Sequence, residues 1–215
     1  MKLDDNDYFS IIKNGKPFHS SETLELILAH LDTKIRVTIA EYAVERVFLH
    51  AGVVAWKGKA IIIPGKSFQG KSTLVSALVE KGALYFSDEY AVLDKKGFVH
   101  PFPKMLSLRG VVDDFRQIDM AVETIGGKAS KKELPVGMVL LTEYNAEAVW
   151  KPIQLTMGEG IMELLPHTIP IRNNPEFSLN VLNKLVNRAI ISKTQRGEAG
   201  IFAEIILNFF ETQAF

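Results

Sequence analysis

Eight consecutive residues, Gly65 to Ser72, have the spacing of a phosphate-binding loop. They read Gly-Lys-Ser-Phe-Gln-Gly-Lys-Ser and match the pattern G-x-x-x-x-G-K-[ST]. In such a loop, backbone N–H groups surround a polyphosphate, and the following helix directs its positive N-terminal end at the anion. Lys71 would reach the terminal phosphates, and the Ser72 hydroxyl would bind Mg²⁺. The predicted nucleotide-binding residues are Gly65, Lys66, Ser67, Phe68, Gln69, Gly70, Lys71, Ser72 and Thr73.

The segments around this motif support a nucleotide site over an ordinary glycine-rich turn. An apolar strand at residues 59–63 precedes the loop, and a helical pattern at residues 71–81 follows it. Residues 47–56 also read as a strand, and Lys57-Gly58 is a turn sequence. We therefore expect a β-hairpin leading into the loop, which differs from the parallel arrangement of most phosphate-loop proteins.

Two adjacent carboxylates, Asp88 and Glu89, follow the next predicted strand at residues 83–87. One carboxylate at this position can hold the metal, and the other can take a proton from an attacking hydroxyl. Neighbouring residues of a strand face opposite ways, so both reach one site only where the chain bends. The alternative is that one of the two is a solvated turn residue.

With these elements in place, the chain resembles the catalytic domain of HPr kinase/phosphorylase. The resemblance is strongest over residues 47–93, where His50-Ala51-Gly52, the hairpin, the loop and Ser87–Val92 follow one another at matching intervals. Leu108-Arg109-Gly110 is similar to a further segment of that family, and residues 169–173 are loosely similar to another.

The resemblance implies an α/β fold like the phosphoenolpyruvate carboxykinase nucleotide domain, with a mixed β-sheet flanked by helices. It also implies transfer of a phosphoryl group from ATP to a serine hydroxyl, with Mg²⁺, in a homo-oligomer. The implied catalytic residues are Asp88, Glu89, His50 and Arg109, and the implied metal ligands are Ser72 and Asp88. His50 would lie near the phosphates, Arg109 would stabilise the transferred group, and the order of roles within the acidic pair stays open.

Four features depart from the family pattern. Phe68 stands where the family has glycine, Ser107 where it has glutamate, and Glu89 where it has aspartate. Only 46 residues precede the resemblance, so we expect no counterpart of the family's own N-terminal domain. We therefore expect a related protein and do not carry over the HPr substrate or the reverse phosphorolysis activity.

Two regions follow from these assignments. Residues 1–46 are predicted to form an N-terminal extension with a helix at 21–31 and a strand at 34–40, and residues 47–215 to form the nucleotide-binding domain. In the second region we predict a buried strand at 136–142 and helices at 158–165, 178–191 and 198–211. His100 and His167 have no ligand-spaced partners and are predicted to be structural.

Composition narrows the function classes. The formal net charge is zero, which argues against a dedicated nucleic-acid or membrane-surface protein, and no cysteine is present to form disulfides or thiolate sites. The acidic N-terminus has no secretory signal and no apolar run is long enough to span a bilayer, so a cytoplasmic protein is expected.

Three functions remain. The first is a kinase for a protein or small-molecule hydroxyl, which the intact loop and acidic pair favour. The second is a nucleotide-dependent binding or regulatory module with little transfer activity, which Phe68 and Ser107 favour. The third is a nucleotide hydrolase that acts on a partner. The sequence does not identify the acceptor.

Overall fold

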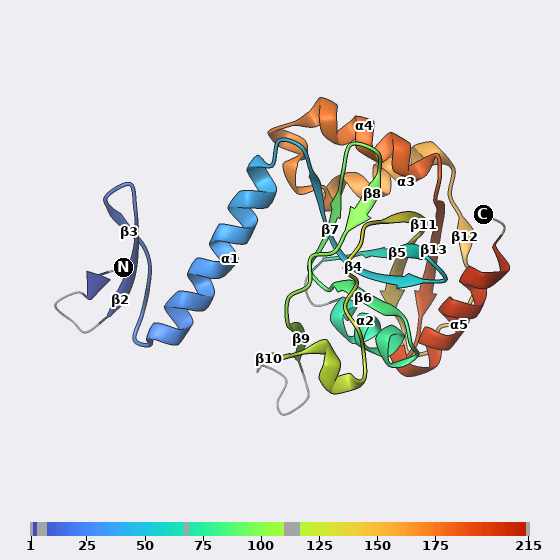
Figure 1. Cartoon of the computed structure of the whole chain (residues 1–215), viewed down its shortest axis with the longest axis horizontal. Helices are drawn as coiled ribbons and strands as arrows, with labels where there is room; N and C mark the ends of the chain where they lie inside the picture. The colour runs from blue at the N-terminus through green and yellow to red at the C-terminus, as the bar shows by residue number, and fades with distance from the viewer. Residues whose placement is uncertain (1, 4–7, 67–68, 110–116, 214–215) are drawn as a thin grey trace. The chain divides into compact units, whose positions relative to one another are not determined.

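The computed structural model describes residues 2–3, 8–66, 69–109 and 117–213 (Figure 1). The chain forms two compact units, Met1–Ala43 and Val44–Phe215.

The first unit contains a small antiparallel sheet and one long helix. Strands β1 (Lys2–Leu3), β2 (Phe9–Lys13) and β3 (Lys16–Ser21) pair in that order, and helix α1 spans Leu24–Tyr42. The predicted strand at 34–40 is wrong, because these residues continue the helix. Contacts one turn apart stabilise it there: Arg36 pairs with Asp32 at 2.7 Å, and the Thr38 hydroxyl donates to the Lys34 carbonyl.

The second unit is built on a mixed, mostly antiparallel sheet in the order β12-β13-β11-β5-β4-β7-β8, with β6 paired to β4. Strand β5 is antiparallel to β4 but parallel to β11, which is also parallel to β13. Lys57 and Gly58 join β4 to β5 with positive φ at both positions, so the predicted hairpin is confirmed. The strands are β4 (Val47–Trp56), β5 (Lys59–Pro64), β6 (Leu84–Ser87), β7 (Tyr90–Leu93), β8 (Phe98–His100), β11 (Leu134–Tyr144), β12 (Ile153–Gln154) and β13 (Ile190–Arg196).

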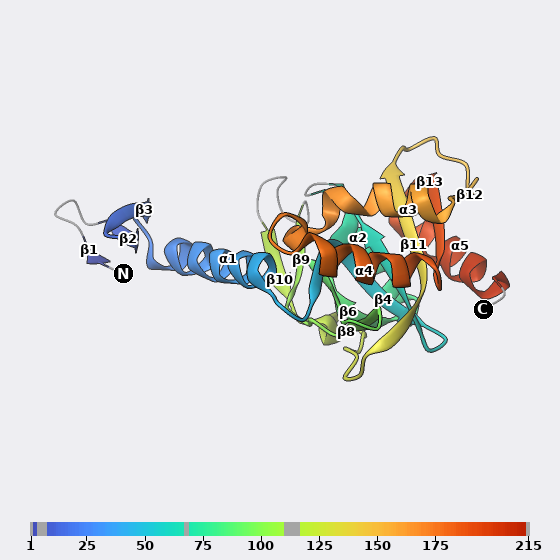
Figure 2. The same ribbon diagram turned by 90° about the horizontal axis from the view of Figure 1, so that it is seen from above.

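Helices cover both faces of this sheet (Figures 1 and 2). The cluster under α3 (Met157–Leu164) and α4 (Pro175–Val186) contains Ile62 of β5, whereas Ile61 and Ile63 pack on the other face with α2 (Lys71–Glu80) and α5 (Ala199–Thr212). This alternation follows the two-residue period of a strand with both faces buried. The predicted mixed α/β sheet flanked by helices is confirmed.

The remaining elements are short. Strands β9 (Leu106–Arg109) and β10 (Gln117–Met120) form a separate antiparallel pair, and 3-10 turns lie at η1 (Val122–Ile125), η2 (Leu165–His167) and η3 (Ile169–Arg172). The predicted helix at 178–191 ends earlier, because its last residues already belong to β13. None of the helices in the described part of the chain combines the length and apolar character needed to cross a membrane.

Candidate functional site

The phosphate loop connects the end of β5 to the start of α2, as predicted. Gly70 has φ +71° immediately before the helix, which is a left-handed conformation suited to glycine. A Cβ atom on Gly70 would also lie 2.6 Å from an Nη atom of Arg196. Within the loop, the Gln69 side-chain oxygen accepts a hydrogen bond from the Lys66 N–H. Glycine at position 70 is therefore required both by the turn and by a close neighbour.

Lys71 is buried at the start of α2 and turns back over the loop. Its ammonium group donates to the Lys66 carbonyl at 2.7 Å. Burial lowers its pKa to about 8, and the opposing charge of Asp88 limits this decrease. A phosphate in the loop would give the Lys71 ammonium an anionic partner in place of the Lys66 carbonyl.

Asp88 lies beside the first turn of α2. Its Oδ2 atom accepts from the Ser72 hydroxyl at 2.9 Å and from the Ser107 N–H at 3.0 Å, while Oδ1 accepts from the Tyr85 hydroxyl at 3.1 Å. Burial and the Asp88 charge both raise the pKa of Tyr85, so this phenol stays protonated and donates. Three donors therefore fix the Asp88 carboxylate next to the hydroxyl of the phosphate loop.

The chain bends at the acidic pair, between β6 and β7. The Ser87 hydroxyl oxygen accepts from the N–H groups of Glu89 and Tyr90, which holds this turn. Lys104 lies 3.6 Å from a Glu89 carboxylate oxygen and 4.0 Å from one of Asp88. The two carboxylates therefore lie near the same cation, the Lys104 ammonium. The bend between β6 and β7 allows both of these neighbouring residues to face it.

His50 and His167 lie across from each other near the loop. An antiparallel bridge pairs Leu49 of β4 with Thr168, which places the next residues, His50 and His167, in opposing positions. Burial lowers the pKa of His50 to about 4, with Lys71 and His167 adding to the effect. Burial, Lys71 and Lys66 also lower the pKa of His167. Both imidazoles are therefore neutral near pH 7, and His167, predicted to be structural, lies at the site.

Arg196 braces the loop from behind and was missed by the sequence reasoning. This buried guanidinium, at the end of β13, donates to the carbonyls of Gln69 and Gly70 at 3.3 and 3.0 Å and to that of Gly197 at 3.1 Å. Arg196 therefore fixes the orientation of two carbonyls immediately before α2. No strand is predicted at 190–196 from the sequence, so nothing in the pattern pointed to Arg196.

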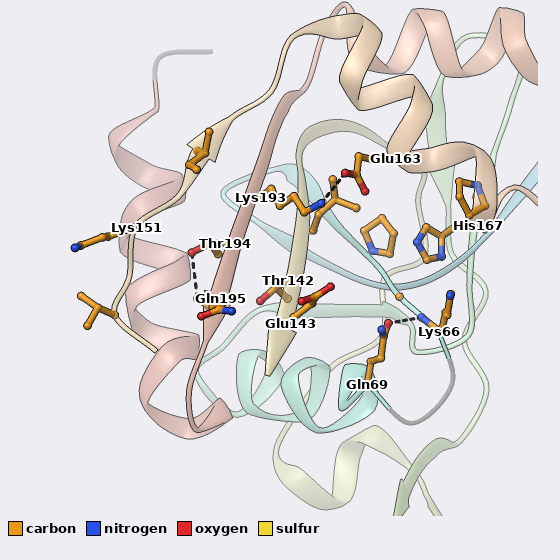
Figure 3. A pocket seen from close by; sticks show the side chains of 16 residues that line it. Lys66, Gln69, Thr142, Glu143, Lys151, Glu163, His167, Lys193, Thr194 and Gln195 are labelled. Atoms are coloured by element: carbon orange, nitrogen blue, oxygen red, sulfur yellow. Dashed lines mark hydrogen bonds and ion pairs between the residues drawn. The ribbon is translucent and has the colours of Figure 1, made fainter. Parts of the chain in front are cut away.

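A cleft of about 730 Å³ opens at the Gly65–Lys66 end of the loop (Figure 3). Lys66, Gln69 and His167 lie on one side of it, and the Lys193–Glu163 ion pair, at 2.6 Å, lies across from them. The remaining wall comes from the ends of β11 and β13 and from the 149–153 segment.

Some predicted site residues are not placed. Ser67, Phe68 and the side chain of Arg109 lie outside the described residues, although the backbone of Arg109 pairs with Gln117 in the β9–β10 ladder. Ser107, where the resembled family has glutamate, donates to Asp119 at 2.6 Å and accepts from Lys104 at 2.9 Å. Among the described residues, no three histidine, aspartate or glutamate side chains gather as a metal-binding group.

No family model matches the chain, and no curated protein matches it in sequence. The chain is similar in structure to the HPr(Ser) kinase/phosphatase from Coxiella burnetii, with a TM-score of 0.42 and 14% identity. The match covers 76% of this chain and 95% of that chain. That neighbour is the kind of protein that the sequence resembles.

Proposed function

We propose that this chain is an ATP-binding phosphotransferase that moves the γ-phosphate onto a hydroxyl of an unidentified protein or small molecule. The hydrogen bond from Ser72 to Asp88, at 2.9 Å, carries the proposal. It joins the hydroxyl of the phosphate loop to a carboxylate that follows a neighbouring strand, which is the pairing that phosphate-loop enzymes use around a metal. The proposal includes a phosphoenolpyruvate carboxykinase-like arrangement of the domain.

The direction of the bound nucleotide follows from Lys71. The loop lysine reaches the β- and γ-phosphates, while the first N–H groups of the helix hold the α- and β-phosphates. The ammonium group of Lys71 lies 2.7 Å from the Lys66 carbonyl. The γ-phosphate should therefore lie at the Lys66 end of the loop, and the α-phosphate at the Thr73 end.

The residues at the metal position fit Mg²⁺. This ion prefers oxygen ligands and usually combines one or two protein groups with phosphate oxygens and waters. Ser72 and Asp88 supply a hydroxyl and a buried carboxylate that already contact each other. When bound, Mg²⁺ would neutralise charge on the phosphates, and these two residues would hold it.

The cleft at the Lys66 end is the space that we propose for the acceptor; Lys66 and His167 line it, whereas Asp88 and Glu89 do not. The acceptor oxygen would attack the γ-phosphorus while the bond to the β–γ bridging oxygen breaks, so that ADP leaves and the hydroxyl proton passes to a base. With Asp88 held by three donors, Glu89 is the carboxylate of the pair that we assign as this base. His50 and Arg109 are proposed to act at the phosphates.

One observation favours the second function, a nucleotide-dependent binding or regulatory module. The Gln69 side-chain oxygen occupies the Lys66 N–H, one of the loop groups that a phosphate would use. A loop that satisfies its own donors can bind nucleotide and still hold it unproductively.

Incubation with γ-labelled ATP, Mg²⁺ and cell extract separates these functions, with a Lys71→Met variant as the blank. Label transferred to a protein or small molecule by the wild type alone supports the kinase. Nucleotide binding without transfer supports the binding module. Label found only as free phosphate supports a hydrolase and would overturn the kinase proposal.

A further inference from the structure

A second cavity, of about 480 Å³, opens at the other end of the phosphate loop. Its volume is in the range of small-molecule sites. It borders Gly70 and Thr73, whereas the first cavity borders Gly65 and Lys66, and Gln69 and Glu143 line both cavities. Its lining residues are Gln69, Gly70, Thr73, Glu143, Tyr144, Arg196, Glu198 and Ala199.

The position of this cavity matches the α-phosphate end of the nucleotide. Lys71 draws the terminal phosphates toward Lys66, so the opposite end of the phosphate chain lies at the first turn of α2, where Thr73 stands. The nucleoside is attached to the α-phosphate. In a nucleotide bound this way, the nucleoside would leave the loop beside Thr73, which lines the second cavity.

Tyr144 gives this cavity an aromatic surface. It is the last residue of β11 and is 53% exposed. The Arg196 guanidinium carbon lies 5.7 Å from the ring centroid, and the phenol donates a hydrogen bond to Glu198. A cation against the ring and an anchored hydroxyl restrict its motion, and a restricted, exposed ring is a suitable platform for a flat base.

The charged groups of the cavity favour a ligand with hydrogen-bond donors. Glu143 and Glu198 are acceptors, and the buried Arg196 already donates to three carbonyls. Ribose hydroxyls and the amino group of a base can donate to the two carboxylates. An extra phosphate on the ribose would face the same carboxylates and be repelled.

We propose that this cavity is the nucleoside subsite, in which the base stacks on Tyr144 and its donors face Glu143 and Glu198. The inference rests on the proposed function, because it requires a nucleotide in the loop. In this arrangement Tyr144 contacts the base of the nucleotide and none of its phosphates.

Inorganic tripolyphosphate distinguishes binding at the loop from binding at the nucleoside subsite, since it carries the phosphates without a nucleoside. Calorimetry with Mg²⁺ should give the wild type a higher affinity for ATP than for tripolyphosphate. Tyr144→Ala should weaken ATP binding about tenfold, as expected for one lost stacking contact, and leave tripolyphosphate binding within about twofold. Tyr144→Phe keeps the ring and should stay within about twofold of the wild type for both ligands. Tyr42→Ala, an exposed tyrosine of α1, is the matched control and should change neither affinity.

Three results would overturn the inference. The first is an equal loss of ATP and tripolyphosphate affinity in Tyr144→Ala, since it would assign Tyr144 to the support of the loop. The second is unchanged ATP affinity in the same variant. The third needs no variant: if the wild type binds tripolyphosphate as tightly as ATP, no nucleoside subsite exists. A wild type that binds neither ligand would instead refute the proposed function itself.

Discussion

Replacing Arg196 by methionine should both destabilise the protein and weaken nucleotide binding. Methionine replaces the aliphatic part of the arginine side chain but cannot make its three hydrogen bonds, to the carbonyls of Gln69, Gly70 and Gly197. Hydrogen bonds from charged groups contribute about 1.5–3 kcal/mol each. The cost of burying the charge offsets part of this, since within the described part of the chain the Nε atom has no partner. We expect a net loss of about 3 kcal/mol.

For a unit of this size, such a loss lowers the melting temperature by about 6–12 °C. Because two of the lost contacts fix loop carbonyls, ATP affinity should also fall about tenfold when measured by calorimetry below the melting range. Arg188→Met is the matched control: Arg188 is exposed and donates one hydrogen bond, to the Lys96 carbonyl, so its loss should cost less than about 0.5 kcal/mol. The reasoning fails if both variants melt within 2 °C of each other and bind ATP alike, the 2 °C being roughly the shift that 0.5–1 kcal/mol produces.

Lys71→Ala should abolish ATP binding or weaken it sharply, and unchanged affinity in this variant would contradict the role of Lys71. Wild-type affinity for ATP should decline above about pH 8, because the Lys71 ammonium loses its proton there. Calorimetry in two buffers of different ionisation enthalpy should detect the proton uptake that accompanies binding. His50 has a pKa of about 4 in the folded protein against 6.5 in the unfolded chain, so the unfolded state binds the extra proton and the free energy of unfolding should fall as the pH drops from 6.5 to 4. Urea unfolding of His50→Gln should show a shallower decrease, and parallel profiles would remove His50 as the cause. The double variant Asp88→Asn, Glu89→Gln should keep nucleotide bound but stop transfer to acceptor, and retained turnover would exclude the pair as the base.

The local part of the site could be predicted from the sequence, because short-range patterns encode it. The hairpin, the loop and the helix that begins at Lys71 are contiguous, and each is set by glycines and by the spacing of apolar residues. The strand predicted at 34–40 is wrong because its residue pattern and its contacts favour different structures. Its β-branched residues alternate as in a strand, but i,i+4 contacts such as Asp32–Arg36 hold them in a helix.

The contacts across the sheet could not be predicted. Arg196 is separated from Gly70 by 126 positions, and only the parallel register of β5, β11 and β13 brings them together. His167 reaches His50 through a single bridge between β4 and the irregular segment at Thr168, for which no periodic pattern exists. Ligand spacing along the chain is therefore a poor guide to a site that is assembled by strand order.

The Gln69 oxygen and the Lys66 carbonyl act as internal substitutes for an anion, since one accepts a loop N–H and the other accepts from the Lys71 ammonium. A phosphate bound at these two groups would displace both contacts, and so would compete with the protein's own atoms as well as with water. Orthophosphate or sulfate offers few new contacts in exchange, whereas a chain of phosphates spans the whole loop. If the loop binds a nucleotide as proposed, these two internal contacts would favour a polyphosphate over the small anions that are abundant in cells.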